Sequence, residues 1–168
     1  MDIFDYHKAI EDALIEKFSG LVETVASYEP AQINPINTPA ILLEMDDCTL
    51  GGTSDDRDEL MASMIAHCIV GHKTPNIDLA VRDFAIQVSQ FLRHNVFKIK
   101  GIGQPENIQL GKGEFKPGKH GYESWYVSWD QAVYLTESVF SSDGFVPEQI
   151  FIGRHPDVGD DATQYEQL

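Results

Sequence analysis

The most constraining feature of this chain is the segment 121–135, in which large apolar residues alternate with polar ones. In an extended strand, successive side chains point to opposite faces of the sheet. One face would carry Glu123, Trp125, Val127, Trp129, Gln131, Val133 and Leu135, and the other Tyr122, Ser124, Tyr126, Ser128, Asp130, Ala132 and Tyr134. The pattern predicts a long strand that buries its first face and offers hydroxyls and tyrosine rings on its second.

Length and composition favour one folded domain. A chain of 168 residues can bury roughly 70% of its unfolded surface, and an apolar share of 42% excludes wholesale disorder. No apolar run approaches the ~20 residues of a membrane-spanning helix. Asp2 and Asp5 stand where a signal peptide would carry Lys or Arg. We therefore expect no membrane association and no secretory targeting.

The net charge of −15 is unevenly distributed along the chain. Residues 1–59 contain fourteen acidic and three basic residues, residues 60–120 four acidic and eight basic, and residues 121–168 nine acidic and one basic. One interpretation is a soluble acidic protein kept apart from its neighbours by repulsion. The other is a particle with an acidic and a basic side, through which identical copies meet. Direct nucleic-acid binding is disfavoured, because counterion release requires a dense basic face.

Two amphipathic helices are predicted, over residues 3–21 and 76–95, because apolar residues recur there every three or four positions. Asp2 suits the N-cap of the first helix. Thr74 suits the N-cap of the second, with Pro75 at its first helical position. The core-facing residues would be Ile3, Tyr6, Ile10, Leu14, Phe18 and Leu21, then Ile77, Val81, Phe84, Ala85, Val88, Phe91 and Leu92.

Further strands are predicted from short apolar runs between turn residues. Residues 59–70 are ambiguous, because Met, Ala and Leu favour a helix whereas Cys68-Ile-Val70 before a glycine favours a strand. We predict a long strand here, paired with residues 40–45. Three prolines in residues 30–39 exclude both a helix and a central strand there. The other predicted strands are 22–28, 40–45, 106–111 and 149–152.

A zinc site is considered and disfavoured. His67, Cys68 and His72 with the distant Cys48 have suitable ligand atoms, but the chain has no Cys-x-x-Cys pair. In a strand the adjacent His67 and Cys68 would also point to opposite faces. Both cysteines lie in apolar stretches, so we predict that Cys48 and Cys68 are buried free thiols.

Other catalytic and cofactor patterns are weak. No Gly-x-Ser-x-Gly is present, and Gly111-Lys-Gly-Glu falls short of a phosphate loop. An acidic group could gather Mg²⁺ or Ca²⁺, even between subunits, but it lacks the spacing of a calcium loop, so a solvated loop is favoured. That group is Asp46, Asp47, Asp55, Asp56, Asp58 and Glu59. We predict no catalytic residue, no cofactor, no bound metal and no enzymatic activity.

The aromatic residues of segment 121–135 divide into two roles. Trp125 and Trp129 are interpreted as core residues. Tyr122, Tyr126 and Tyr134 share the other face, and aromatic rings with polar handles are common where proteins meet. The chain therefore points to assembly more than to chemistry.

The order of these parts resembles the tail terminator, or tail-completion, proteins of long-tailed and contractile-tailed phages, particularly the Mu-like prophage group. The resemblance covers nearly the whole chain, from the first helix through the strand that ends in Cys68-Ile-Val-Gly71. Its most specific pieces are Glu123-Ser-Trp-Tyr-Val-Ser-Trp-Asp130 and the ending Pro156-Asp-Val-Gly159 with Tyr165.

The resemblance implies an α+β fold: a twisted, mixed and mostly antiparallel sheet with two main helices packed on one face. It implies a strand, not a helix, for residues 59–70. A single domain would span residues 1–152, followed by a polar acidic tail over 153–168. In such families six copies form a ring on the end of the tail tube, assembled in the cytoplasm of the bacterial host. The implied partners are the protein itself, the tail tube protein, the sheath protein of a contractile tail, and the neck or head connector.

The residues themselves suggest where copies would meet. The loops 51–58 and 112–120 have opposite charge and are expected to project from strand ends, and the tail after Gly153 could order on a neighbour. The predicted interface residues are Asp55, Asp56, Arg57, Asp58, Lys112, Lys116, Lys119, Tyr126, Arg154 and Asp157.

Two other functions remain open at this point. A small cytoplasmic hydrolase could use a cation held by the carboxylates near Asp47. An acidic protein could also mimic nucleic acid and block a DNA-binding enzyme.

Overall fold

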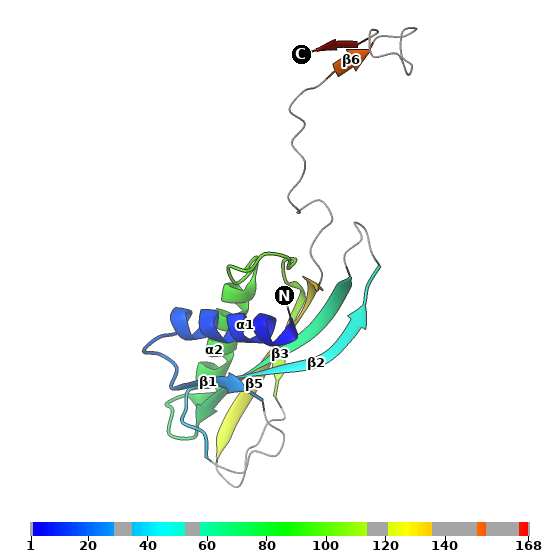
Figure 1. Ribbon diagram of the computed structural model, residues 1–168. Helices are drawn as coiled ribbons and strands as arrows, with labels where there is room; N and C mark the ends of the chain where they lie inside the picture. The colour runs from blue at the N-terminus through cyan, green and yellow to red at the C-terminus, as the bar shows by residue number, and fades with distance from the viewer. Residues whose placement is uncertain are drawn as a thin grey trace. The chain divides into compact units, whose positions relative to one another are not determined.

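A computed structural model describes residues 2–28, 35–52, 58–113, 121–135, 151–153 and 165–167, and Figure 1 shows the course of the chain. The chain divides into two compact units, Met1–Glu137 and Ser138–Leu168. Each unit is described by itself.

The first unit is a five-stranded sheet with the strand order β1-β2-β3-β5-β4. β1 runs parallel to β2, and every other pair of neighbours is antiparallel. Helices α1 (Ile3–Lys17) and α2 (Ile77–Leu92) pack on the sheet, which confirms the predicted α+β fold. The strands are β1 (Thr24–Ser27), β2 (Ala40–Leu50), β3 (Glu59–Gly71), β4 (Glu106–Lys112) and β5 (Tyr122–Tyr134).

Helix α1 begins as predicted and ends early. Asp2 is its N-cap, and its carboxylate accepts a hydrogen bond from the backbone N–H of Asp5 at 2.8 Å. The helix ends at Lys17, where the prediction extended it to residue 21. Gly20 has a φ of +78°, a left-handed conformation that suits glycine. The chain therefore turns away before Leu21. This residue was predicted to face the core, but it is 65% exposed.

Helix α2 lies inside the predicted range, but its start was predicted wrongly. Its N-cap is Asn76, not Thr74, and Asn76 has a φ of 49° with no side-chain cap hydrogen bond. Asparagine tolerates the left-handed region better than most residues. The inward stripe of α2 is Val81, Ala85, Val88 and Leu92.

The ambiguous segment 59–70 is a strand paired with β2, as predicted and as the resemblance implied. β3 pairs with β2 on one side and with β5 along its whole length on the other. Its residues alternate between buried and half-buried from Glu59 to Cys68. Two ladders of hydrogen bonds and a buried face outweigh the helix propensity of Met, Ala and Leu.

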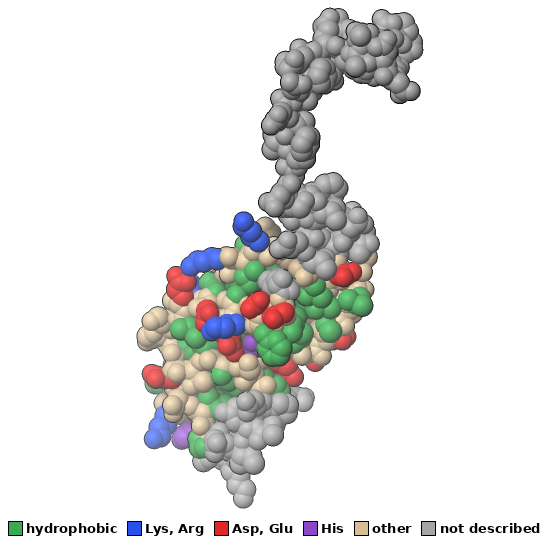
Figure 2. All heavy atoms as spheres, in the orientation of Figure 1, with side chains coloured by type: hydrophobic (Ala, Val, Ile, Leu, Met, Phe, Trp, Pro, Cys, Tyr) green, Lys and Arg blue, Asp and Glu red, His purple; other side chains and the backbone are tan. Residues whose placement is uncertain are grey.

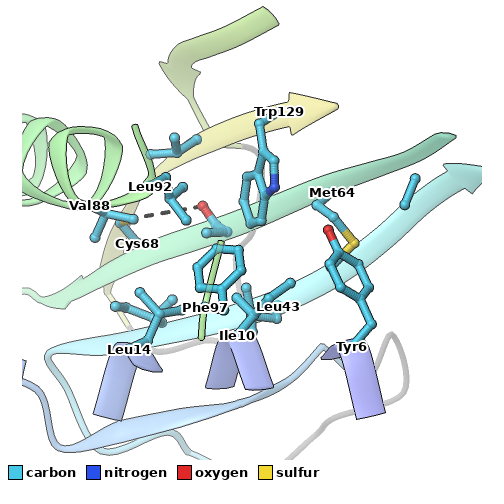
Figure 3. Close-up of a cluster of buried hydrophobic side chains, with 14 of the residues drawn as sticks. Tyr6, Ile10, Leu14, Leu43, Met64, Cys68, Val88, Leu92, Phe97 and Trp129 are labelled. Carbon is cyan, nitrogen blue, oxygen red and sulfur yellow. Dashed lines mark hydrogen bonds between the residues drawn. The ribbon is translucent and has the colours of Figure 1, made fainter. Parts of the chain in front are cut away.

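The core lies between the sheet and the two helices (Figure 3). From α1, Tyr6, Ile10 and Leu14 point towards the sheet, where Trp129 and Met64 are buried. Val127, Trp129, Gln131 and Val133 of β5 are also buried, as the alternation in this strand predicted.

A buried amide joins several parts of this core. Gln131 is fully buried, and its Oε1 accepts hydrogen bonds from the hydroxyl of Tyr6 at 2.9 Å and from Nε1 of Trp129 at 3.3 Å. Its Nε2 donates to the carbonyl oxygens of Gly103 at 2.8 Å and Asn95 at 3.4 Å. One side chain thus connects α1, β5 and the connection between α2 and β4.

The two cysteines differ, against the prediction that both are buried. Cys68 lies in the core, and burial raises the pKa of its thiol. Cys48 is exposed, because the outer part of β2 extends beyond the core.

The two thiols are therefore expected to react at very different rates. An aromatic disulfide reagent at pH 8 should modify Cys48 at the rate of a free thiol and leave Cys68 unmodified until the protein unfolds. The absorbance of the released thiolate gives both rates. Cys48→Ser is the control and should abolish the fast phase. Two fast thiols in the native protein would contradict the burial of Cys68.

The second unit contains an antiparallel pair, β6 (Phe151–Gly153) and β7 (Tyr165–Gln167). β6 falls close to the strand predicted over 149–152. β7 lies in the segment predicted to be a polar tail, where the residues gave no strand signal.

Candidate functional site

The candidate site is the sheet face opposite the helices, which we call the open face. Alternation along each strand turns one set of polar side chains to this side. No helix in the described part of the chain packs on it. Its members beyond the apolar end include Glu44 and Asp47 of β2; Ser63, Ile65 and His67 of β3; Tyr126, Ser128 and Asp130 of β5; and Asn107 and Gln109 of β4. All of these side chains are at least partly exposed.

One end of the open face is closed by a small apolar cluster. Ala40, Leu42 and Ile69 are buried there beneath Ile36, and Tyr122 packs against them. The Tyr122 hydroxyl donates to the carbonyl oxygen of Ile36 at 3.2 Å. This cluster holds the segment before β2 against the sheet, so contact with another molecule is left to the polar remainder of the face.

A histidine and a glutamate occupy the middle of the open face. Nε2 of His67 lies 2.7 Å from Oε2 of Glu44, and the two side chains are 14% and 28% exposed. The ring of Tyr28 lies over His67, with 5.0 Å between centroids. Glu44 pairs with Ile65, and His67 pairs with Leu42, so Glu44 and His67 are diagonal neighbours on strands β2 and β3. The register of these two strands therefore brings them together. This pair holds a carboxylate and an imidazole in fixed positions on a half-buried surface.

Next to this pair, an aspartate is held by two donors. Asp130 accepts a hydrogen bond from the Ser63 hydroxyl at 2.7 Å and from Nδ2 of Asn107 at 2.9 Å. Asn107 has a φ of 52° and lies in a register shift of β4. Such bulges re-aim side chains. The irregular start of β4 is therefore what brings an amide to the Asp130 carboxylate.

His67, Ser63, Asp130 and Asn107 line a shallow hollow of about 410 Å³. A second bulge places Asp46 at its rim, between Met45 and Asp47. Ile65 and Tyr126 contribute apolar surface, and Gln109 and Ser128 contribute hydrogen-bonding groups. The hollow contains two aspartates and one histidine, and no Lys or Arg lines it among the described residues. Its chemistry suits a cationic or hydrogen-bond-donating partner surface.

Tyr126 is the predicted interface residue that lies squarely in this site. It pairs with Gly111 of β4, and a Cβ on Gly111 would come within 2.7 Å of its ring. The glycine therefore makes room for the tyrosine ring to lie across the edge of the sheet. Tyr126 is half-buried, with ring surface left for contact.

Of the other predicted interface residues, the structure describes two, Asp58 and Lys112. Asp58 lies at the end of the sheet where its carbonyl oxygen accepts from the N–H of Leu135 at 3.0 Å. Lys112 pairs with Trp125 of β5. Trp125 lies ten positions before Leu135, which corresponds to roughly 30 Å at the usual rise of a strand. Asp58 and Lys112 thus lie towards opposite ends of the sheet. Asp55, Asp56, Arg57, Lys116, Lys119, Arg154 and Asp157 lie outside the described residues.

The metal-ligand candidates are separated. His67 is on the open face while Cys68 is in the core, as their adjacency in a strand required. Within the described ranges, no three His, Cys, Asp or Glu side chains converge to hold a metal ion. Likewise, no helix of those ranges is long and apolar enough to cross a membrane.

The sequence predicted that one face of segment 121–135 makes contacts, but it did not predict the side-chain pairs on the open face. Ser63, His67 and Glu44 were not predicted as site residues, and Asp130 was assigned only to a strand face. The signal that existed was alternation, which places a residue on a face. Which residues meet depends on register and on the two bulges, and these are not visible in a single strand.

Compared with known proteins, the chain matches no protein-family model and no curated protein.

Proposed function

We propose that this protein is a ring-forming structural subunit of a phage tail or of a particle derived from one, acting as a tail terminator. Six copies would form a ring on the end of the tail tube and stop its growth. The ring would also cap the sheath of a contractile tail and offer a docking surface to the neck or head connector. Its place would be the virion tail, after assembly in the host cytoplasm.

The observation that carries the proposal is the open face. A sheet with helices on one side leaves its other side half-buried, and here that side carries a tyrosine, a histidine and fixed carboxylates. Aromatic and hydrogen-bonding groups of this kind are typical of protein contacts. Asp58 and Lys112 carry opposite charges towards the two ends of the sheet, which suits a contact between two different patches. Such a contact generates rings when the rotation closes. The sequence resemblance supplies the kind of ring.

The direct test is electron microscopy of tails made in a host that lacks this protein. Overlong or unfinished tubes are expected, with normal length restored when the protein is supplied in trans. Finished tails of normal length in its absence would refute the proposal.

The charged loops provide a second test. The hypothesis is that the acidic loop 51–58 of one copy meets the basic loop 112–120 of the next. Asp56→Lys and Lys116→Glu are each expected to weaken ring formation on tube ends, because each variant places like charges where these two loops meet. The double variant should recover part of the loss. Ring occupancy is counted on negatively stained tubes. If neither single change alters capping, the loops take no part in the contact.

A further inference from the structure

We propose that the open face of one copy binds the outer surface of helix α2 of a second copy. The contact gives the proposed ring its subunit interface and rests on that function. It is heterologous, because each copy uses two different surfaces, and repeated contacts of this kind produce a ring or a filament.

The open face has room for an apolar partner between acidic groups. Its hollow of about 410 Å³ is lined in part by Ile65 and Tyr126. Around it lie the carboxylates of Glu44, Asp46 and Asp130, and Asp46 is exposed. The face therefore offers the apolar surface of Ile65 and Tyr126 close to negative charge.

The outer surface of α2 has the complementary composition. Leu79 and Ile86 are 65% and 46% exposed and lie seven residues apart, two turns along one side of the helix. Arg82 on the helix and Arg93 at its end are exposed beside them. Lys100 follows in the connection to β4 and is also exposed.

Two acidic residues of α2 partly offset the positive charge of Arg82, Arg93 and Lys100. Asp78 and Asp83 lie on the exposed part of the helix, and Asp83 accepts a hydrogen bond from Gln87 at 2.6 Å. The basic end is therefore the C-terminal end, where Arg93 stands. We expect that end to lie against the carboxylates of the open face.

The outer apolar pair is not needed by the fold. The inward stripe, from Val81 to Leu92, already packs α2 on its own sheet. Figure 2 shows hydrophobic side chains among charged ones on the face in view. No described residue covers Leu79 and Ile86 fully, so a second molecule on this surface would bury them further. A sheet face with apolar side chains is a surface against which helices pack. Opposite charges at the rim would fix the orientation and favour encounter.

The experiment uses two full-length variants that each lose one side of the contact. Ser128→Arg puts a long cation on the open face, and the pair Leu79→Glu and Ile86→Glu puts carboxylates on the outer surface of α2. Wild-type protein is expected to form concentration-dependent assemblies in sedimentation velocity. Each variant alone should remain monomeric, with at least a tenfold weaker association.

Mixing the two variants is the decisive step. Each retains the surface that the other lacks, so the mixture should form a one-to-one dimer and nothing larger. Ser19→Arg and Ile15→Glu are matched controls at other exposed positions and should assemble like wild type. Unchanged circular dichroism shows that the variants fold, and Asp47→Arg, at an exposed position, replaces Ser128→Arg if that variant does not.

Several results would overturn the contact. A mixture that stays monomeric, variants that assemble like wild type, or wild-type protein that is monomeric at every accessible concentration would each do so. Wild-type rings that survive both variants would leave the tail-terminator function standing while refuting this interface. Finished tails of normal length without the protein would refute the function independently.

Discussion

Trp129→Ala is expected to lower the free energy of unfolding by about 3–5 kcal/mol, the range for emptying a large aromatic site in a core. The Trp129 side chain is 1% exposed and lies in the core cluster of the sheet. Its indole N–H also donates to Gln131. Removing it leaves a cavity in the centre of β5, which the two adjacent strands can close only in part. Urea unfolding followed by circular dichroism measures the loss.

Trp125 provides the matched comparison, because it lies on the same strand and the same face. It is half-buried, and the guanidinium of Arg82 lies 5.4 Å from its ring. Trp125→Ala should cost about 1–2 kcal/mol, from partial burial and a cation–π contact. Equal losses for the two variants would mean that the two tryptophans do not differ in burial as described.

Gln131→Leu should lower the free energy of unfolding by about 3 kcal/mol, although leucine is close in size. The substitution removes the acceptor of the Tyr6 hydroxyl and of the Trp129 N–H inside the core. It also removes the donor to the carbonyl oxygen of Gly103. Each buried unsatisfied group costs about 1–3 kcal/mol. Burial already raises the pKa of the Tyr6 phenol, which therefore stays neutral and depends on this hydrogen bond.

The smaller change Tyr6→Phe separates the hydrogen bond from the packing. Gln131 keeps its other three partners, so a loss of about 1 kcal/mol is expected. Gln87→Leu, on the exposed side of α2, controls for the chemical change. If Gln131→Leu proves as stable as wild type, the amide is not the buried junction that we describe.

The sequence predicted the fold where periodicity is long and one-sided. Segment 121–135 alternates over its full length, and the structure buries the predicted face from Val127 to Val133. The inward stripe of α2 follows from spacing in the same way. Both signals are local, because a residue's face depends only on its own element.

Features set by neighbouring elements were harder to predict. Local propensity left β3 undecided, because its strand conformation comes from the two strands that flank it. The end of α1 was placed too late, since Leu21 continues the apolar spacing although the chain has already turned at Gly20. Cys48 was predicted buried from its apolar neighbours, but it lies where β2 has left the core.

The candidate site shows the same limit more strongly. Tyr126 was predicted from its face alone. The pairs Glu44–His67 and Ser63–Asp130 require the register of three strands, and Asn107 reaches Asp130 through a backbone irregularity. Neither register nor a bulge has a reliable signature in a single strand.

The outer part of β2 has a mechanical consequence. Residues 46–50 are all exposed, and β1 pairs only as far as Leu43. Among the described residues, this stretch is therefore held by the β3 ladder alone, and it has no buried side chain of its own to resist bending or twisting. It can adapt its curvature to whatever it touches at little energetic cost, while the part beside the helices stays rigid.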